Sequence, residues 1–335
     1  CPRPRTEPSA PSMGILDVFK RATAPVSRRL GPVSRRFGAH KPEKADLFGD
    51  DFQKKLEVLA IVSRRVFAGR QRADRRTKKK GSGIEFADHR DYTAGDDFRS
   101  VDWNIYRRFG RLLVRLYEEE EDLSIYFIVD CSTSMGFGDG KKFDQARRLA
   151  AALAYVGLAN LDRVTIVTTT DEIVARMPTT RGKGRIFKVF DFLRRSQCDG
   201  QTGLEDSLKT FVAQHKRRGL AVLISDLYDP AGFEAGINVL RYNKFEPYVL
   251  HIVDPAEARP TLKGDVRIYD CETGDEREVT VTAKMLERME RAWNDYKDEV
   301  ERFCTKNQVP YFAADVDTSF DELVLGVFRR GGFLR

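Results

Sequence analysis

The fold is decided by the stretch Leu123-Ser-Ile-Tyr-Phe-Ile-Val-Asp-Cys-Ser-Thr-Ser-Met135. Its first part, Ile125 to Val129, is a continuous apolar run of the kind found in strands that are buried on both faces of a parallel sheet. A polar turn follows at once, and the next segment predicts an amphipathic helix from about Phe143 to Asn160. Ligand sites in open α/β sheets lie just past the carboxyl ends of strands. The stretch therefore predicts a central strand with a site at its end.

Strand and helix patterns alternate along the rest of the chain. Apolar runs predict strands at 164–170, 172–177, 220–225, 247–253 and 311–314, and a hairpin at 266–281. Amphipathic patterns predict helices at 186–195, 204–216, 231–242, 283–307 and 320–329. This alternation indicates an α/β fold, Rossmann-like, with a mainly parallel sheet flanked by helices on both faces.

The N-terminal part follows a different pattern. Apolar residues at helical spacing predict a helix over Asp51–Phe67, and Leu112–Tyr117 predicts a strand. Between them, Gly81–Tyr106 mixes glycine, opposite charges and large aromatic residues, which predicts a loop-rich segment held by aromatic anchors and ion pairs. His89 is interpreted as a surface or hydrogen-bonding histidine.

Charge is distributed unevenly along the 335 residues. Residues 1–80 hold 21 Lys and Arg against 8 Asp and Glu, a net charge of +13, whereas the remainder carries −6. The tandem repeat at 25–38 (Pro-Val-Ser-Arg-Arg-Leu-Gly, then Pro-Val-Ser-Arg-Arg-Phe-Gly) and the run Arg70–Lys80 fit a solvated, disordered basic region. Weak contact of residues 20–80 with an anionic surface or with nucleic acid stays open as an alternative.

Composition restricts the compartment. We expect no transmembrane segment, because no apolar run reaches the roughly 18–20 residues that a spanning helix needs, and no secretory signal. The five cysteines form no Cys-x-x-Cys pair, so the sequence indicates neither a zinc ribbon nor a disulfide framework. A cytoplasmic location fits best.

Oxygen-bearing side chains follow three predicted strand ends. The first loop holds Asp130, Ser132 and Ser134, the second holds Thr202, and the third begins with Asp226. Carboxylate and hydroxyl oxygens suit a hard cation such as Mg²⁺ better than Zn²⁺. Five side chains cannot all bind directly and leave an open position, so some are expected to act through water.

These residues resemble the metal-ion-dependent adhesion site (MIDAS) of von Willebrand factor A domains, in the pattern Asp-x-Ser-x-Ser, a distant Thr, and Asp after an apolar strand. The upstream block is similar to that of the bacterial DUF58 family, in the motifs Gly83-Ile-Glu-Phe86, Arg90-Asp-Tyr92, Gly95-Asp-Asp-Phe-Arg99 and Asp102-Trp103. The resemblance implies Mg²⁺ or Mn²⁺ held by the three hydroxyls, with the two aspartates binding directly or through water. It also implies an open metal position completed by a partner's acidic side chain, and association with a MoxR-type AAA+ ATPase that matures or activates other proteins.

Taken together, the patterns predict four parts: a basic, disordered tail at 1–45, an N-terminal helix with the DUF58-like block at 46–122, a von Willebrand factor A-like core at 123–255, and a C-terminal hairpin and helices at 256–335 that complete the α/β domain. We expect a non-catalytic protein-interaction module, because the sequence shows neither a P-loop nor a Gly-x-Ser-x-Gly elbow. A metal-dependent phosphohydrolase is the other alternative, although Ser132 stands where HAD-type phosphatases carry their second aspartate.

Overall fold

The computed structural model describes residues 46–59, 76–81, 85–120, 123–136, 140–261, 264–270 and 276–330. Four predicted parts lie outside the described residues: the basic tail at 1–45 with its tandem repeat, the end of the N-terminal helix, residues 70–75 of the basic run, and the hairpin turn at 271–275.

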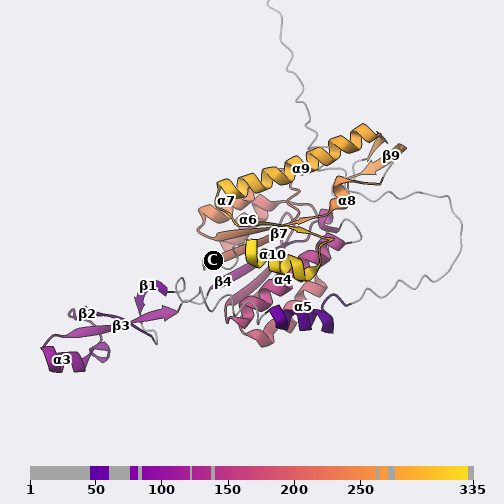
Figure 1. Ribbon diagram of the computed structural model, residues 1–335. Helices are drawn as coiled ribbons and strands as arrows, with labels where there is room; N and C mark the ends of the chain where they lie inside the picture. Colours follow the sequence, from indigo (N-terminus) through magenta and orange to yellow (C-terminus); the bar gives the residue numbers. More distant parts are fainter. Residues whose placement is uncertain are drawn as a thin grey trace, which may run out of the picture.

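A six-stranded sheet forms the centre of the molecule (Figure 1). Its strand order is β11-β8-β7-β4-β5-β6, and every neighbouring pair is parallel except β5 with β6. The strands are β4 (Ser124–Asp130), β5 (Arg163–Thr169), β6 (Ile173–Thr180), β7 (Leu220–Ser225), β8 (Glu246–Val253) and β11 (Tyr311–Asp315). The prediction of a mainly parallel sheet, and of its individual strands, is confirmed.

Counted along the chain within this sheet, the strands take the doubly wound order 3-2-1-4-5-6. The order reverses between β4 and β7, which are direct neighbours (Ile128 opposite Leu223). In such sheets the connections leave the carboxyl ends of the two central strands in opposite directions, and a crevice opens there. The topology therefore places the ends of β4 and β7 at this switch point, and we call the region around them the crevice.

Alternate residues of β4 supply the two halves of the core. Ile125, Phe127 and Val129 pack on one face, together with α4, α5, α10 and a helix at 50–59. Tyr126 and Ile128 pack on the other, with α6, α7 and α9. The helix bounds are Lys141–Ala159 (α4), Ile186–Arg195 (α5), Leu204–Gln214 (α6), Glu234–Tyr242 (α7), Ala283–Lys306 (α9) and Phe320–Arg330 (α10). Figure 1 shows the sheet between these two helical layers, as predicted.

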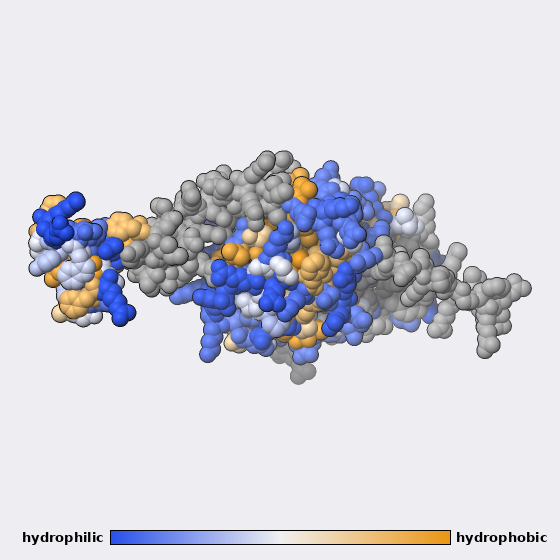
Figure 2. Space-filling view, turned by 90° about the horizontal axis from the view of Figure 1, so that it is seen from below, coloured by the Kyte–Doolittle hydropathy of each residue, from blue (hydrophilic) through white to orange (hydrophobic). Residues whose placement is uncertain are grey.

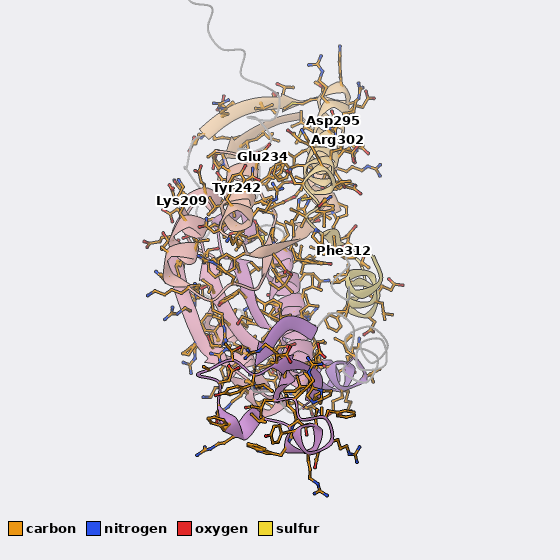
Figure 3. The ribbon with its side chains drawn as sticks, turned by 90° about the vertical axis from the view of Figure 1, so that its left-hand side faces the viewer. Lys209, Glu234, Tyr242, Asp295, Arg302 and Phe312 are labelled. Carbon is orange, nitrogen blue, oxygen red and sulfur yellow. The ribbon has the colours of Figure 1, made fainter. Side chains whose placement is uncertain are left out.

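The C-terminal part contributes to the same sheet. Strand β11 pairs with β8 (Ala313 opposite His251), and Phe312 lies against α10, where Gly326 leaves only 2.7 Å to the ring for an added Cβ (Figure 3). A short helix, α8 (Pro255–Ala258), and a hairpin of β9 (Gly264–Tyr269) and β10 (Glu276–Val281) precede α9. The four-part division of the chain stays a prediction.

A second, antiparallel sheet corrects the expectation of a loop-rich segment. Its order is β1-β3-β2, with β1 (Arg76–Gly81), β2 (Glu85–Asp91) and β3 (Leu113–Glu120). Figure 1 shows this sheet to one side of the main sheet. A turn, η1 (Phe98–Ser100), and the helix α3 (Trp103–Phe109) connect β2 with β3. The helix forms because Asp102 caps the amides of Asn104 and Ile105 and because Gly110 ends it in the left-handed region.

The register of β7 depends on a glycine that touches the neighbouring strand. A Cβ on Gly219 would lie 2.1 Å from the backbone oxygen of Ser124. We expect Gly219→Ala to lower the free energy of unfolding by about 1–3 kcal/mol, because β4 and β7 would have to separate. The matched control is Gly184→Ala, whose Cβ meets nothing within 4 Å. Urea unfolding measures both, and equal stabilities would contradict the packing argument.

Candidate functional site

The first site residue, Asp130, is the last residue of β4 and is buried in the crevice. Its Oδ1 accepts a hydrogen bond from the backbone N of Ser132 (2.8 Å), and its Oδ2 accepts one from the Ser225 hydroxyl (2.5 Å). Ser225 ends β7, and its Oγ also accepts from the backbone N of Leu227 (2.8 Å). The two central strands are therefore joined at their carboxyl ends by a side-chain bond.

Two hydroxyls stand next to this carboxylate. Ser132 and Ser134 are both buried, and their Oγ atoms lie 3.0 Å apart. The short turn η2 (Thr133–Gly136) brings them together, because it folds the chain back directly after the strand. The first predicted loop thus presents one carboxylate and two adjacent hydroxyls.

The second loop is held against the first by the residue between the serines. The backbone N and the hydroxyl of Thr133 both donate to the carbonyl of Gly200, at 3.0 and 2.9 Å. Thr202 lies two residues further on and is buried. The start of α6 is tied to the third loop, since the backbone N of Leu204 donates to Asp229 at 2.6 Å. The three predicted loops therefore form one connected structure.

The third loop contains an arrangement that the sequence did not predict. Asp226 is fully buried, and its Oδ2 accepts from the ammonium of Lys142 at 2.7 Å. Lys142 also donates to Oε1 of Glu257 at 2.6 Å, and Tyr228 donates to the other oxygen of Glu257 at 3.0 Å. All four side chains are buried. Asp226, a predicted metal ligand, thus already pairs one of its carboxylate oxygens with the ammonium of Lys142.

A sequence signal for Lys142 existed. It stands in the first turn of α4, where a positive charge opposes the helix dipole. A lysine in that place indicates a carboxylate nearby in the fold, but the chain pattern does not reveal which carboxylate. Glu257, 115 residues away, carries no local signal at all.

The two aspartates are in different electrostatic environments. Burial, followed by the negative charge of Asp226, raises the pKa of Asp130 to about 7. The carboxylates of Asp226 and Glu257 outweigh burial at Lys142 and hold its pKa above the ordinary value, so the lysine stays charged. Burial raises the pKa of Glu257. Asp226 and Glu257 each pair with Lys142, whereas no Lys or Arg of the described residues lies within ion-pair distance of Asp130.

The donor set fits a hard divalent cation in part. Within the described ranges no three His, Cys, Asp or Glu side chains converge, so a cation here would depend on the hydroxyls of Ser132, Ser134 and Thr202. Asp130 supplies a buried carboxylate whose charge such a cation would neutralise. Asp226 has only Oδ1 free of the lysine, and this oxygen accepts a 3.3 Å bond from the backbone N of Tyr228.

Comparison with known proteins identifies the family. The family described as "Protein of unknown function DUF58" matches residues 88–299, which is more than half of the chain. The chain belongs to the DUF58 family. The matched region begins within β2 and ends within α9, so it includes most of the antiparallel unit and all of the crevice.

Relatives of this DUF58 protein occur in mycobacteria. It is 23% identical over 270 residues to "Uncharacterized protein Rv1480" of Mycobacterium tuberculosis and equally to "Uncharacterized protein Mb1516" of Mycobacterium bovis, a match that covers 78% of this chain and 85% of each relative. "Uncharacterized protein MAV169" of Mycobacterium avium is 30% identical over 102 residues, which cover 30% of this chain and 60% of that protein.

Solved structures give weaker likenesses. BatB from Bacteroides thetaiotaomicron aligns with a TM-score of 0.39 at 14% identity, and an aerotolerance-related membrane protein from Bacteroides fragilis with 0.35 at 13%. Each alignment covers 62% of this chain and 98% of the other. Scores this low carry no conclusion about function. No helix among the described residues of the DUF58 chain has the length and apolar character to cross a bilayer.

Removal of the buried ammonium tests how far the crevice depends on it. We expect Lys142→Met to lower the free energy of unfolding by about 3–5 kcal/mol, because Asp226 and Glu257 would be left buried without a counter-charge. The neighbouring Lys141 is exposed, so Lys141→Met should stay within about 0.5 kcal/mol of wild type. Urea unfolding measures the free energy of unfolding of both variants. A stable Lys142→Met protein would show that the ion pair is dispensable.

Asp130 predicts a pH dependence of stability without added metal. Its pKa is raised from 3.8 to about 7 on folding, so between about pH 4 and 7 the folded chain keeps a proton that the unfolded chain has lost. This contribution is complete at the acid end and falls as the pH rises, by at most about 1.4 kcal/mol per pH unit. Asp130→Asn has no such proton, so the stability difference between wild type and variant should shift against wild type from pH 5 to pH 7. Urea unfolding in EDTA measures the difference, with Asp298→Asn on the exposed side of α9 as the control. A constant difference would contradict the raised pKa.

Proposed function

We propose that this DUF58 chain is a non-catalytic, metal-dependent protein-interaction module with a von Willebrand factor A-like core. The ion is Mg²⁺ or Mn²⁺, and the hydroxyls of Ser132, Ser134 and Thr202 hold it, with Asp130 and Asp226 binding directly or through water. An acidic side chain of a partner protein completes the shell. The partner is a MoxR-type AAA+ ATPase, or a client protein, whose maturation or activation the module serves.

One observation carries this proposal: the residues that the adhesion-site pattern selects lie at the switch point of the sheet. Asp130 ends β4 and Asp226 follows β7, where the strand order reverses. Ligand crevices of doubly wound sheets open at that point. The first two loops are joined by Thr133, which stands between the two serines and donates to the carbonyl of Gly200, two residues before Thr202.

Electrostatics supports the binding of a cation together with an acidic partner. The ammonium of Lys142 balances one of the charges on Asp226 and Glu257, and Asp130 adds a further carboxylate. With all three carboxylates ionised, these four side chains together carry a net charge of −2, which one divalent ion would neutralise. A neutral loaded site would then accept an additional carboxylate from outside without strong repulsion.

A hydrolytic function has less support. Ser132 stands two residues after Asp130, where HAD-type phosphatases carry their second aspartate. Its hydroxyl bonds to Ser134 and lacks the acidity that a proton donor to a leaving group needs. Lys142, the buried cation nearest to Asp226, has both of its short bonds directed to carboxylates of its own chain. We therefore propose binding as the function of the crevice.

Calorimetric titration of Mg²⁺ and Mn²⁺ into EDTA-treated protein tests metal binding. We expect one ion per wild-type chain and at least a tenfold loss of affinity in Ser132→Ala/Ser134→Ala, because both hydroxyls are proposed ligands. Thr210→Ala, which removes an exposed hydroxyl on α6, serves as the control and should bind like wild type. Equal binding by the double variant and wild type would refute this ligand set.

Partner binding is tested with a purified MoxR-type ATPase. We expect association in Mg²⁺ that EDTA abolishes, and we expect Asp130→Ala to abolish it while the circular dichroism spectrum stays unchanged. If Asp130→Ala associated normally in Mg²⁺, the metal would have no role in the interface. Metal binding without association would instead point to a different acidic partner.

A further inference from the structure

The antiparallel unit exposes several of the aromatic side chains that the sequence predicted as anchors of the segment. Trp103, Tyr106 and Phe109 of α3 are 52%, 45% and 71% exposed, and Phe98 in the preceding turn is 59% exposed. In Figure 2 this unit, at the end of the molecule, carries hydrophobic and hydrophilic surface side by side. Single exposed aromatic residues are ordinary, but several on one short element indicate a binding surface.

Three of these residues share one side of the helix. Trp103, Tyr106 and Phe109 follow one another at intervals of three, so they lie next to each other along α3. The rings of Trp103 and Tyr106 are 6.1 Å apart in edge-to-face orientation. We call these three residues the aromatic stripe. The helix is attached to its own sheet by other residues, since Val101 just before it is fully buried and bridges to Val114.

The arginines beside the aromatic stripe differ from three other arginines of the unit, which are paired with carboxylates. Arg90 pairs with Asp96 (2.8 Å), Arg111 with Asp91 (3.2 Å) and Arg115 with Asp102 (3.5 Å). Arg107 and Arg108 are exposed, and no carboxylate of the described residues lies within ion-pair distance of either. The helix thus offers aromatic surface together with two guanidinium groups available to a partner.

The charge balance of the unit selects among partners. Residues 76–120, from the start of β1 to the end of β3, contain ten Lys and Arg and nine acidic residues, so the unit is close to neutral. A neutral unit has no general attraction to the phosphates of nucleic acid or to anionic lipid, both of which require a net positive surface. Guanidinium groups instead bind carboxylates in a specific two-point geometry. Trp, Tyr and Arg are also the residues that dominate the binding energy of protein–protein interfaces.

We propose that the aromatic stripe and the flanking Arg107 and Arg108 bind an acidic segment of another protein, one that carries apolar side chains between its carboxylates. The apolar groups pack on the stripe, and the carboxylates pair with the two guanidinium groups. The capped ends of α3, at Asp102 and Gly110, fix the helix before binding, which lowers the entropic cost of association. This surface needs no metal and is independent of the crevice.

The test uses random 16-residue peptides displayed on phage and selected on the full chain in EDTA. We expect the selected peptides to be rich in Asp and Glu with Leu, Ile, Phe or Trp between them. Binding of the synthetic peptides is then measured by the tryptophan emission of the protein, because the chain has two tryptophans and the other, Trp293, is buried. A peptide without tryptophan should shift the emission to shorter wavelength, and Trp103→Phe should remove that shift.

Matched variants assign the binding to this surface. Trp103→Ala/Phe109→Ala should weaken peptide binding at least tenfold, measured by calorimetry, whereas Phe187→Ala/Tyr242→Ala, which removes two equally exposed rings from the main domain, should not change it. Arg107→Glu/Arg108→Glu should reject the acidic peptides, and the same selection on this variant should yield Lys- and Arg-rich peptides.

Three outcomes would overturn the proposal. The selection yields no acidic peptides, or the selected peptides bind wild type and Trp103→Ala/Phe109→Ala equally. The third is that vesicles of 30% phosphatidylserine in phosphatidylcholine, or a single-stranded oligonucleotide, bind wild type in a manner that the double variant loses, while the peptides do not bind. This last result would assign the surface to a bilayer or to nucleic acid. Because EDTA is present throughout, failure of the metal site does not affect the result.

Discussion

The buried ammonium of Lys142 is the interaction on which the geometry of the crevice depends. It connects the first turn of α4 with Asp226, 84 residues later, and with Glu257 in α8, 115 residues later. Lys142 lies on α4, Asp226 directly follows β7 and Glu257 lies on α8, so the ion pair joins three separate elements. A charge buried in this way is costly unless all its partners are in place. The ion pair therefore permits one arrangement of the three elements.

This constraint divides the crevice into two chemically different halves. On one half, Asp226 and Glu257 are matched with a cation that belongs to the protein. On the other half, Asp130 accepts hydrogen bonds from the Ser225 hydroxyl and from Ser132, and burial beside Asp226 raises its pKa. A solvent cation would be drawn to the second half. The adhesion-site interpretation of the sequence treats both aspartates alike, and the structure shows that they are not equivalent.

Local patterns were sufficient for most of the elements and insufficient for the interior of the site. Strand β4 and the helix at Ile186–Arg195 could be predicted because the apolar residues that each buries follow a regular pattern within one short segment of sequence. The pairing of Lys142 with Glu257 could not, because it depends on how distant elements pack. The helix α3 was missed for another reason: its aromatic residues face outward, so the rule that large apolar residues lie inside gave a misleading answer.

Residues that are bonded to one another in the crevice lie far apart in the sequence, and this has a consequence for biosynthesis. The bond between Asp130 and Ser225 closes a segment of 95 residues, and the bond of Lys142 to Glu257 closes a longer one. A chain that emerges from the ribosome in sequence order exposes the β4 strand and its carboxylate long before β7 and α8 exist. Until residue 225 has been made, the central strand β4 lacks its neighbour β7, and until residue 257 has been made, Lys142 lacks its partner Glu257. The crevice is thus a late product of folding, and a nascent chain displays its most apolar strand for the longest time.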